Sequence, residues 1–552
     1  MARGSRPPSQ KDGDGMAIYR SLQVLRKHCV LVIFLAVTPA HFGAGVASPL
    51  PGFPGFLGAL SGIRAPLGAP LPSPWAPATS TSMETPPVAP PAGPAPPLPR
   101  RAAAFTPPVS RVDLATSDPR FGIDEAYRQP DLADALGARW SRIPFIWDYI
   151  QPDGPGSWNT FALGSQGTDA VINGELARGR SVVGLLLGTP PWARQNAAWG
   201  QASVPINIDK PWNDPQNYWA AYCYKIAQHF AGRINDWVIW NEVSIPAGLN
   251  GAMGLWTQWR GTPEQYARVL EVAYRAIHAA NPHARIVLYG DPFWYDHGAY
   301  LIKLCKILAA ADPTNHYHGY FDVANLHLYS NPTDFYWIVR KVHAMLKAHG
   351  WGAKQIWISE TNAEPYNGTT PHKRHTNFRV SMQAQAAFLV DAFASDLAAG
   401  VDRIEVYRMF DGVETAHGLP AWGLVNNAGQ QRPVARTFHF LVRLFKHATG
   451  GSYTPGRKLD HKAGVFKVVV DKPGARITVL WNQDRARARY KLPAQATQAT
   501  LYDKFGNART IRPRKRVYVL SLPGGDDFTN PFDPRVPTVG GDPAIVVERL
   551  PR

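Results

Sequence analysis

The sequence predicts an α/β protein, a (β/α)8 TIM barrel followed by a small antiparallel β domain. Between residues 115 and 450, eight apolar strand candidates alternate with amphipathic helices over roughly 335 residues. Such alternation predicts a parallel sheet, and eight units of this length fit a closed barrel. Two of the strand candidates, 236–242 and 355–360, end in a glutamate. A doubly wound open sheet is the alternative, but no G-x-G-x-x-G turn follows a strand in this sequence.

The barrel elements are expected at regular intervals. Strands are expected at residues 120–124, 138–147, 181–187, 236–242, 286–290, 322–329, 355–360 and 403–409. Helices are expected at residues 132–136, 170–177, 216–230, 300–310, 334–349, 381–399 and 435–447, with one more that begins near residue 262. Residues 216–230 place apolar side chains on one face with a period of about 3.6. Thr262-Pro-Glu-Gln265 has the residues of a capping box, with proline in the first turn.

After residue 450 the pattern changes to short strands. Strand candidates at 465–470, 477–481, 499–502 and 517–522 are separated by turn residues such as Lys472-Pro-Gly474. We therefore place the barrel at 115–450, a β-sandwich-like domain at 451–524 and a loose tail at 525–552, where proline, glycine and aspartate are frequent.

The amino-terminal segment has the composition of an export signal and a linker. Basic residues are followed by an apolar run, Cys29 to Val37, and then by small residues, which is the order of a secretory signal. The run is shorter than the roughly 20 residues of a membrane span. Residues 1–47 are therefore expected to form a signal peptide, or an N-terminal anchor if they are not cleaved. Residues 48–114 are expected to form a disordered linker, because 18 prolines fall within 49–108. The protein is expected to be secreted or extracytoplasmic.

Charge and cysteine content narrow the class of protein. The net charge is +17, and residues 451–524 contribute +12 of it, with 16 Lys or Arg against 4 Asp. Such an excess predicts contact with an anionic polymer or a membrane surface, or else a solvated face. No nucleic-acid-binding motif accompanies it, so a nucleic-acid partner is not expected. Only Cys223 and Cys305 follow the leader, which is no disulfide framework.

The two glutamates that end strands, Glu242 and Glu360, are the main candidates for chemistry. The carboxyl ends of barrel strands form one face, so both side chains can converge there. Two converging carboxylates suit the cleavage of a glycosidic bond, where one protonates the leaving oxygen and the other acts at the anomeric carbon. Their proximity would also separate their pKa values. The structural alternative is that each glutamate caps a helix or pairs with an arginine.

The motifs around these strands resemble those of the clan-A retaining glycoside hydrolases. Trp240-Asn-Glu242, paired with a glutamate that closes the seventh strand, carries the resemblance. Thr189-Pro-Pro-Trp192, and Trp147 with Gln151-Pro152, are most similar to family 39 and its relatives. The resemblance covers roughly residues 115–520. It implies Glu242 as acid/base, Glu360 as nucleophile and Asn241 as a ligand of the sugar 2-hydroxyl. Val243 stands where many members have proline.

Three further polar residues lie at expected strand ends. His327 and Tyr329 end the strand at 322–329, and the resemblance implies that they contact the sugar and the nucleophile. Arg142 lies in the strand at 138–147. It is expected either to steady the nucleophile through a charge-assisted hydrogen bond or to be a buried ion-pair partner. Weaker candidates are Asp124, Asp291, Tyr407 and Arg408.

The four tryptophans near the strand ends have different expected roles. Aromatic rings stack on the apolar faces of sugars, but tryptophan also fills cores. We expect Trp192 and Trp422 to be sugar platforms and Trp240 to be core, while Trp147 could serve either role.

The sequence as a whole predicts an exported retaining glycoside hydrolase whose partner is a polysaccharide or oligosaccharide substrate. No cofactor or metal is expected, because the close pair His316-Tyr-His318 lies in a polar loop before a strand, whereas a barrel metal site would use strand ends. The alternatives are a non-catalytic polysaccharide-binding barrel protein and a transglycosylase that acts on an exported polymer.

Overall fold

The computed structural model describes residues 117–159, 169–245, 258–365, 379–411, 421–456, 464–527 and 537–550. These residues belong to one compact unit that spans 74–552. The expected signal or anchor, 1–47, and the expected linker, 48–114, lie outside the described residues. Within the described ranges, no helix is both long and apolar enough to cross a membrane.

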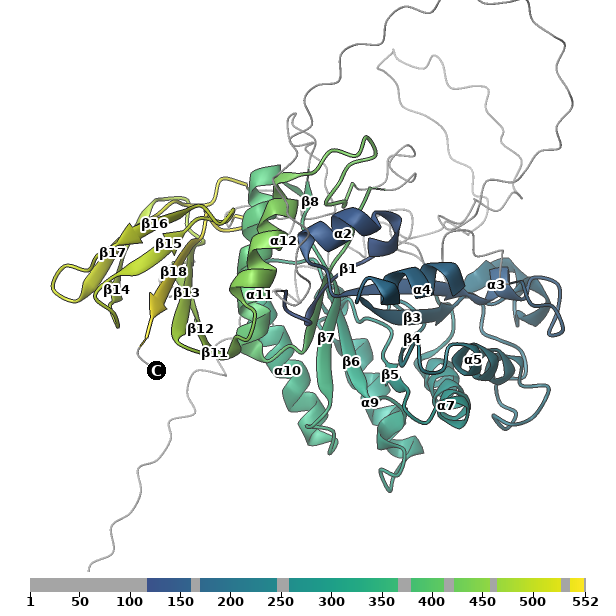
Figure 1. Ribbon diagram of the computed structural model, residues 1–552. Helices are drawn as coiled ribbons and strands as arrows, with labels where there is room; N and C mark the ends of the chain where they lie inside the picture. Colours follow the sequence, from purple (N-terminus) through teal and green to yellow (C-terminus); the bar gives the residue numbers. More distant parts are fainter. Residues whose placement is uncertain are drawn as a thin grey trace, which may run out of the picture. The chain divides into compact units, whose positions relative to one another are not determined.

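Eight parallel strands form the main sheet, in the order β1-β10-β7-β6-β5-β4-β3-β2 (Figure 1). They are β1 (Phe121–Ile123), β2 (Trp140–Ile146), β3 (Ser181–Leu187), β4 (Asp236–Ile239), β5 (Arg285–Val287), β6 (Val323–Leu328), β7 (Gln355–Thr361) and β10 (Arg403–Val406). The two edge strands meet, because the Arg139 N–H donates to the Phe121 carbonyl at 2.9 Å. The sheet is therefore nearly closed, and the predicted (β/α)8 barrel is confirmed.

Helices follow the strands and cover the outside of the barrel. They are α2 (Pro130–Leu136), α4 (Asp169–Ala177), α5 (Tyr218–His229), α7 (Pro263–Ala280), α9 (Ala299–Ala311), α10 (Phe335–Ala348), α11 (Met382–Ala399) and α12 (Pro433–Leu444), with the short α3 (Trp147–Ile150) and α8 (Phe293–Asp296). Helix α7 begins with the expected capping box, in which Thr262 Oγ1 accepts from the Gln265 N–H and the Gln265 side chain accepts from the Thr262 N–H. Its two reciprocal bonds satisfy donors that a helix start leaves unpaired.

The amino-terminal end of the barrel is closed by ion pairs and tryptophans. Asp236, the first residue of β4, pairs with Arg285 at 2.7 Å and with Arg403 at 3.0 Å. The Arg403 guanidinium lies 4.4 Å from the centre of the Trp357 ring. Glycine inside a strand makes room for a further ring, because a Cβ on Gly184 would lie 2.3 Å from the Trp237 indole. This packing leaves the carboxyl ends of the strands as the face where polar chemistry can gather.

The carboxyl-terminal part forms an antiparallel β domain beside α11. One sheet has the order β11-β12-β13-β18-β15-β16, and β14 pairs with β17. The strands are β11 (Thr449–Thr454), β12 (Val465–Lys472), β13 (Ala475–Asn482), β14 (Ala488–Pro493), β15 (Ala499–Tyr502), β16 (Ala508–Ile511), β17 (Val517–Leu522) and β18 (Ala544–Arg549). The four strands predicted for this domain are present as β12, β13, β15 and β17. Helix α11 is buried on nearly every side because it lies between the barrel and β11–β13 (Figure 1).

The expectation of a loose tail after residue 525 is wrong for Ala544–Arg549. This segment is β18, which pairs with both β13 and β15 inside the sheet. Ile545 and Val546 are fully buried, one on each face. Its partners lie 43 to 74 residues earlier in the chain, so the pairing is non-local. A short apolar run that follows a proline- and glycine-rich stretch gives no local signal of such pairing.

Candidate active site

The two candidate glutamates come from β4 and β7, which are separated in the sheet by β5 and β6, and they leave their strands in different ways. Glu242 follows β4 in a turn where Trp240 and Glu242 have φ values of 66° and 44°. Positive φ costs a non-glycine residue on the order of 1 kcal/mol, and contacts hold the turn. The Trp240 N–H donates to the Leu186 carbonyl, and the Glu242 N–H donates to the Tyr289 carbonyl, both at 2.8 Å. Glu360 lies within β7 itself, one residue before its end. Trp240 is fully buried, so its expected place in the core is confirmed.

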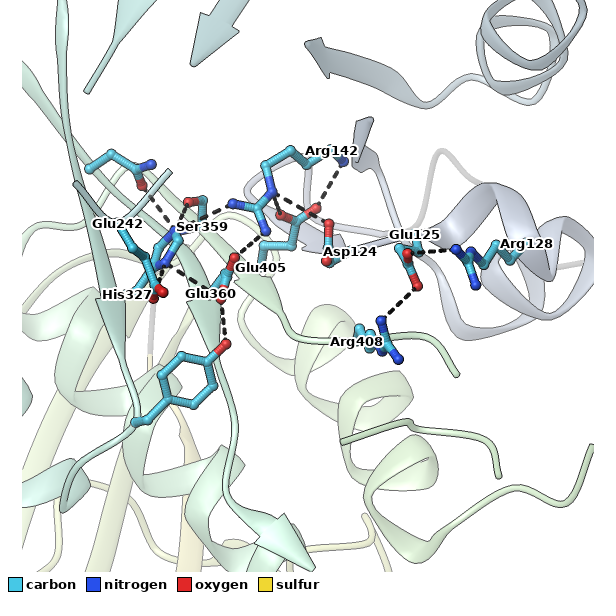
Figure 2. A network of polar contacts seen from close by, with 12 residues as sticks. Asp124, Glu125, Arg128, Arg142, Glu242, His327, Ser359, Glu360, Glu405 and Arg408 are labelled. Atoms are coloured by element: carbon cyan, nitrogen blue, oxygen red, sulfur yellow. Dashed lines mark hydrogen bonds and ion pairs between the residues drawn. The ribbon is translucent and has the colours of Figure 1, made fainter. Parts of the chain in front are cut away.

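His327, on β6, lies between the two carboxylates (Figure 2). Its Nδ1 is 2.9 Å from a Glu242 oxygen and 3.4 Å from a Glu360 oxygen. One oxygen of each glutamate and a nitrogen of His327 all lie within 4.8 Å of one another. Nε2 of the ring is 3.1 Å from the Ser359 hydroxyl. The ring needs the space beside Gly290, because a Cβ there would lie 2.0 Å from Nε2. The structure therefore brings both glutamates to one buried histidine.

Arg142 and Tyr329 hold the Glu360 carboxylate from two sides. The Arg142 guanidinium donates to one oxygen of Glu360, and the Tyr329 hydroxyl donates to the other at 2.5 Å. Figure 2 shows that Arg142 also lies against Asp124 and Glu405. Its Nε is 3.4 Å from Asp124, and its backbone N–H donates to Glu405 at 3.1 Å. Arg142 thus combines both expected roles: it contacts the candidate nucleophile, and it is a buried ion-pair partner.

The surroundings shift the two glutamates in opposite directions. Burial raises the pKa of Glu242, and the neighbouring Glu360 adds to this, while the hydrogen bond with His327 only partly offsets it. Burial also acts to raise the pKa of Glu360. There, however, the charges of His327 and Arg142 and the hydrogen bonds from Tyr329 and Arg142 outweigh it, so the pKa of Glu360 is lowered. Glu242 is therefore suited to hold a proton while Glu360 is ionised.

Asn241 and Trp422 border the same cluster. Asn241 is 7% exposed, and its Oδ1 accepts no hydrogen bond from the described residues. A buried oxygen without a donor is costly, so this atom is ready to accept from a ligand. The Trp422 ring lies 4.9 Å from the Tyr329 ring and 6.3 Å from that of Tyr407, centre to centre. The three aromatic residues form a wall beside Glu360.

Trp192 lies in a different aromatic group. Its ring packs edge-on against Trp147 at 5.7 Å and Tyr218 at 5.2 Å, and its indole N–H donates to the Gln151 carbonyl at 2.7 Å. It is partly buried, and its role as a sugar platform stays a prediction. Trp147 is fully buried, with its N–H donating to the Gln151 side chain at 2.8 Å. Trp147 is therefore core.

Asn362 lies at the site but was not predicted as a site residue from the sequence. It is fully buried two positions after Glu360. Its amide donates to the carbonyl of Tyr407 at 2.6 Å and to that of Trp422 at 2.9 Å. Its oxygen accepts from the Ala363 N–H and the Gln385 side chain. Asn362 thus ties the aromatic wall to the strand that carries Glu360. The sequence feature that could have indicated this role is an amide side chain directly after the strand that carries Glu360.

Glu405 was also missed, although it lies in a predicted strand. It is fully buried in β10 beside Arg142. Burial raises its pKa, and the Asp124 charge adds to this. Burial likewise raises the pKa of Asp124, a weak candidate that the structure places against Arg142. A glutamate between the apolar residues Ile404 and Val406 could have indicated this, because a buried carboxylate needs a partner.

Asp291 and Arg408, two other weak candidates, lie near the site. Among the contacts of the described residues, neither touches Glu242 or Glu360. Asp291 follows β5 and is 1% exposed; the Tyr289 hydroxyl donates to it, and burial raises its pKa to about 8. Arg408 lies 3.5 Å from Glu125, in the outer part of the network in Figure 2.

The cluster of Glu242, His327 and Glu360 also has the separations of a metal site. Arg142 and Tyr329, however, already donate to both oxygens of Glu360. These donors compete with a cation for the same lone pairs. The pair His316 and His318 lies in the loop and short 3-10 turn η6 (His318–Tyr320) that precede β6, at the other end of the barrel.

Comparison with known proteins adds to this geometry. Neither the models of known protein families nor the curated proteins match the sequence. Among solved structures, a family 39 glycoside hydrolase from the gut symbiont Bacteroides cellulosilyticus WH2 has a TM-score of 0.57 at 13% identity, over 79% of this chain and 82% of that one. SrfJ from Salmonella typhimurium has a TM-score of 0.50 at 12% identity, over 79% and 90%. The chain shares the barrel fold of these two structures. A family 30 endoxylanase from Clostridium papyrosolvens C71 also matches, with a TM-score of 0.49 at 13% identity over 79% and 97%.

The predicted resemblance to clan-A glycoside hydrolases is thereby confirmed at the level of the fold. Identities of 12–13% concern the architecture alone, so the chemistry has to be argued from this chain's own residues.

Proposed function

We propose that this protein is a retaining glycoside hydrolase that cleaves a glycosidic bond in a polysaccharide or oligosaccharide. The observation that carries the proposal is the meeting of Glu242 and Glu360 at His327, with one oxygen of each within 4.8 Å. Retaining enzymes place their carboxyl groups about 5–5.5 Å apart, whereas inverting enzymes leave roughly 6.5–9.5 Å for a water. The separation favours retention.

In the first step, an oxygen of Glu360 attacks the anomeric carbon, and the bond from that carbon to the leaving oxygen breaks. Glu242 gives its proton to the leaving oxygen in the same step. The raised pKa of Glu242 and the lowered pKa of Glu360 match these roles. Arg142 and Tyr329 orient the attacking carboxylate through their hydrogen bonds to its oxygens.

In the second step, Glu242 acts as a base. It takes a proton from water, the water oxygen attacks the anomeric carbon, and the bond to the Glu360 oxygen breaks. The sugar leaves with its original anomeric configuration, and both glutamates return to their starting protonation states. His327, 2.9 Å from Glu242, is placed to stabilise the Glu242 carboxylate between the two steps.

The sugar is proposed to lie over Glu360 between Asn241 and the aromatic wall. The Oδ1 of Asn241, which accepts no hydrogen bond from the described residues, can accept one from a sugar hydroxyl. Trp422 offers an indole face beside Tyr329, and such faces stack on the apolar side of sugar rings. Because the substrate is proposed to be a polymer or its fragments outside the cell, residues 1–47 are proposed to direct export. The basic β domain is a candidate contact for an anionic polymer or membrane surface.

Activity is expected to depend on pH as a bell-shaped curve. Glu360 must be ionised to attack, so kcat/KM rises as pH increases through its lowered pKa. Glu242 must be protonated to act as acid, so kcat/KM falls as pH increases through its raised pKa. The active range therefore lies between the two, and it is wider than two unperturbed glutamates would allow. Initial rates on an aryl glycoside across pH test this, and a curve with a single limb would contradict the assignment.

The proposed function is tested by incubating the protein with a panel of aryl glycosides and polysaccharides. We expect cleavage of at least one member, unaffected by a metal chelator, and NMR of the first product should show the anomer of the substrate. The inverted anomer would contradict the proposal. Binding without cleavage across the panel would favour the non-catalytic barrel, and longer products with an added acceptor sugar would identify a transglycosylase.

A further inference from the structure

The exposed face of the β14–β17 pair carries a row of basic side chains. Arg487, Arg489 and Lys491 occupy alternate positions on and just before β14, so they point to the same face. All three are exposed, while the alternate residues Tyr490 and Leu492 pack against the domain core, Tyr490 partly and Leu492 fully buried. The row extends over about 14 Å, at about 3.4 Å per residue.

The hairpin turn before β17 continues this row. Arg514 and Val517 exchange two backbone hydrogen bonds of 3.0 Å around Lys515 and Arg516. Both central residues have positive φ, 49° and 60°. Such a turn favours asparagine and glycine, because their conformational cost there is lowest. Basic residues therefore occupy positions that local backbone energy disfavours. Outliers of this kind point to a role beyond folding.

The row and the turn together form a basic ribbon, which consists of Arg487, Arg489, Lys491, Arg514, Lys515 and Arg516. Residues 485–522 contain ten Lys or Arg and one Asp, a balance of +9. None of the six forms a salt bridge with another described residue. The turn lies next to the end of β14, since the Ala494 N–H donates to the Arg516 carbonyl at 2.9 Å. Like charges are thus held close together, which raises the local positive potential.

We infer that the basic ribbon binds an anionic polysaccharide, one bearing carboxylate or sulfate groups along its chain. An extended row of charges fits a linear polyanion better than a single small anion. Among the described residues of the β domain, Val519 is the only large hydrophobic side chain that is exposed. A membrane contact would use apolar side chains for insertion, and single-stranded nucleic acid would use aromatic platforms. Apart from Val519, which pairs with Lys491, the described residues of this surface offer charge.

The biological role of this binding rests on the proposed function, because a polymer bound at the ribbon would be retained near the barrel that cleaves it. Binding at the ribbon is nevertheless a separate property from cleavage. A short aryl glycoside bound at Glu360 has no reason to contact the ribbon, so the two properties can be measured independently.

The test uses the full-length protein and three variants. The ribbon variant is Arg487→Gln/Arg489→Gln/Lys491→Gln. The matched control, Lys306→Gln/Arg340→Gln/Lys347→Gln, removes the same charge from exposed positions on barrel helices α9 and α10. The third variant, Lys515→Asn/Arg516→Gly, removes two charges and relieves the turn. Probes are polygalacturonate, neutral dextran, and vesicles of phosphatidylcholine with phosphatidylserine, all at low ionic strength.

We expect wild type and control to bind polygalacturonate but not dextran, with salt-sensitive affinity. The ribbon variant should bind about tenfold more weakly, since each exposed ion pair contributes little alone. Lys515→Asn/Arg516→Gly should also bind more weakly while its Tm rises by about 2 °C, because the turn is relaxed. Equal loss in the control, no loss in the ribbon variant, or stronger binding to vesicles than to polygalacturonate would overturn the inference. If neither the wild type nor any of the three variants cleaves the aryl glycoside, the proposed function fails while the binding result still stands.

Discussion

Replacing Glu360 with glutamine is expected to lower kcat on any cleaved aryl glycoside by at least about 10⁴-fold, as when other enzymes lose their nucleophile. A neutral amide cannot attack the anomeric carbon to form the glycosyl ester. Arg142 and Tyr329 each donate to a different Glu360 oxygen, so the donor that faces the amide nitrogen loses its acceptor. KM should change far less than kcat, because the substituted side chain has nearly the same size.

The nucleophile can also be identified chemically. A 2-fluoro glycoside with a good leaving group slows the second step more than the first, so wild type should gain the mass of one sugar on the peptide that contains Glu360. Glu360→Gln should gain none. Glu271→Gln serves as the control, because it removes a glutamate on α7, where Glu271 pairs with Arg268 and Arg275. Full activity in Glu360→Gln with an unchanged Tm would contradict the assignment, and so would a label on another residue.

The pairing of Glu242 and Glu360 could be predicted from the sequence because the geometry of a barrel determines where its strand ends lie. In the sequence each glutamate ends a predicted apolar strand, and in a barrel all strand ends of this kind gather on one face. The register between β6 and β7, which pairs His327 with Glu360, brings the histidine to the same level. Strand position therefore located the two glutamates, and strand position together with the family resemblance located His327, although the three are 85 and 33 residues apart in the chain.

The partners of Arg142 could not be predicted in the same way. Its contacts with Asp124, Glu360 and Glu405 join residues up to 263 positions apart. Which carboxylates share one guanidinium depends on side-chain packing at the closure of the barrel, and periodicity carries no information on that. Asn362 was missed for a related reason. Its role is to hold the backbones of Tyr407 and Trp422, and backbone carbonyls are invisible in sequence.

The two tryptophans expected to bind sugar show the limit of residue type as evidence. Trp422 lies beside Tyr329 in the wall next to Glu360, whereas Trp192 packs against Trp147 and Tyr218. Both follow a strand end and both are partly buried. Only the ring contacts distinguish them, and these depend on the neighbouring loops and helices. A large aromatic side chain gains similar free energy from burial in a core and from stacking on a ligand.

Replacing Glu242 with alanine is expected to reduce kcat by a factor that depends on the leaving group. For a poor leaving group, which needs a proton, the loss should reach about 10²–10⁴-fold, the range of general acid catalysis. For a nitrophenyl group, which leaves without help, the first step should proceed and the second should become limiting, because no base activates water. KM should then fall as the covalent intermediate accumulates. Rates for a series of aryl glycosides with different leaving groups measure this dependence.

Azide separates this assignment from a general loss of structure. The cavity left by Glu242→Ala adjoins His327, which lies 2.9 Å from the wild-type carboxylate, and a small anion can enter it without needing a proton removed. Azide should therefore restore turnover and yield a glycosyl azide of the same anomeric configuration as the substrate. The alkaline limb of the pH curve should disappear in the same variant, because the raised pKa that produces it belongs to Glu242. An inverted azide product would assign the nucleophile role to Glu242 instead, and an alkaline limb that persists would assign the titrating acid to another residue.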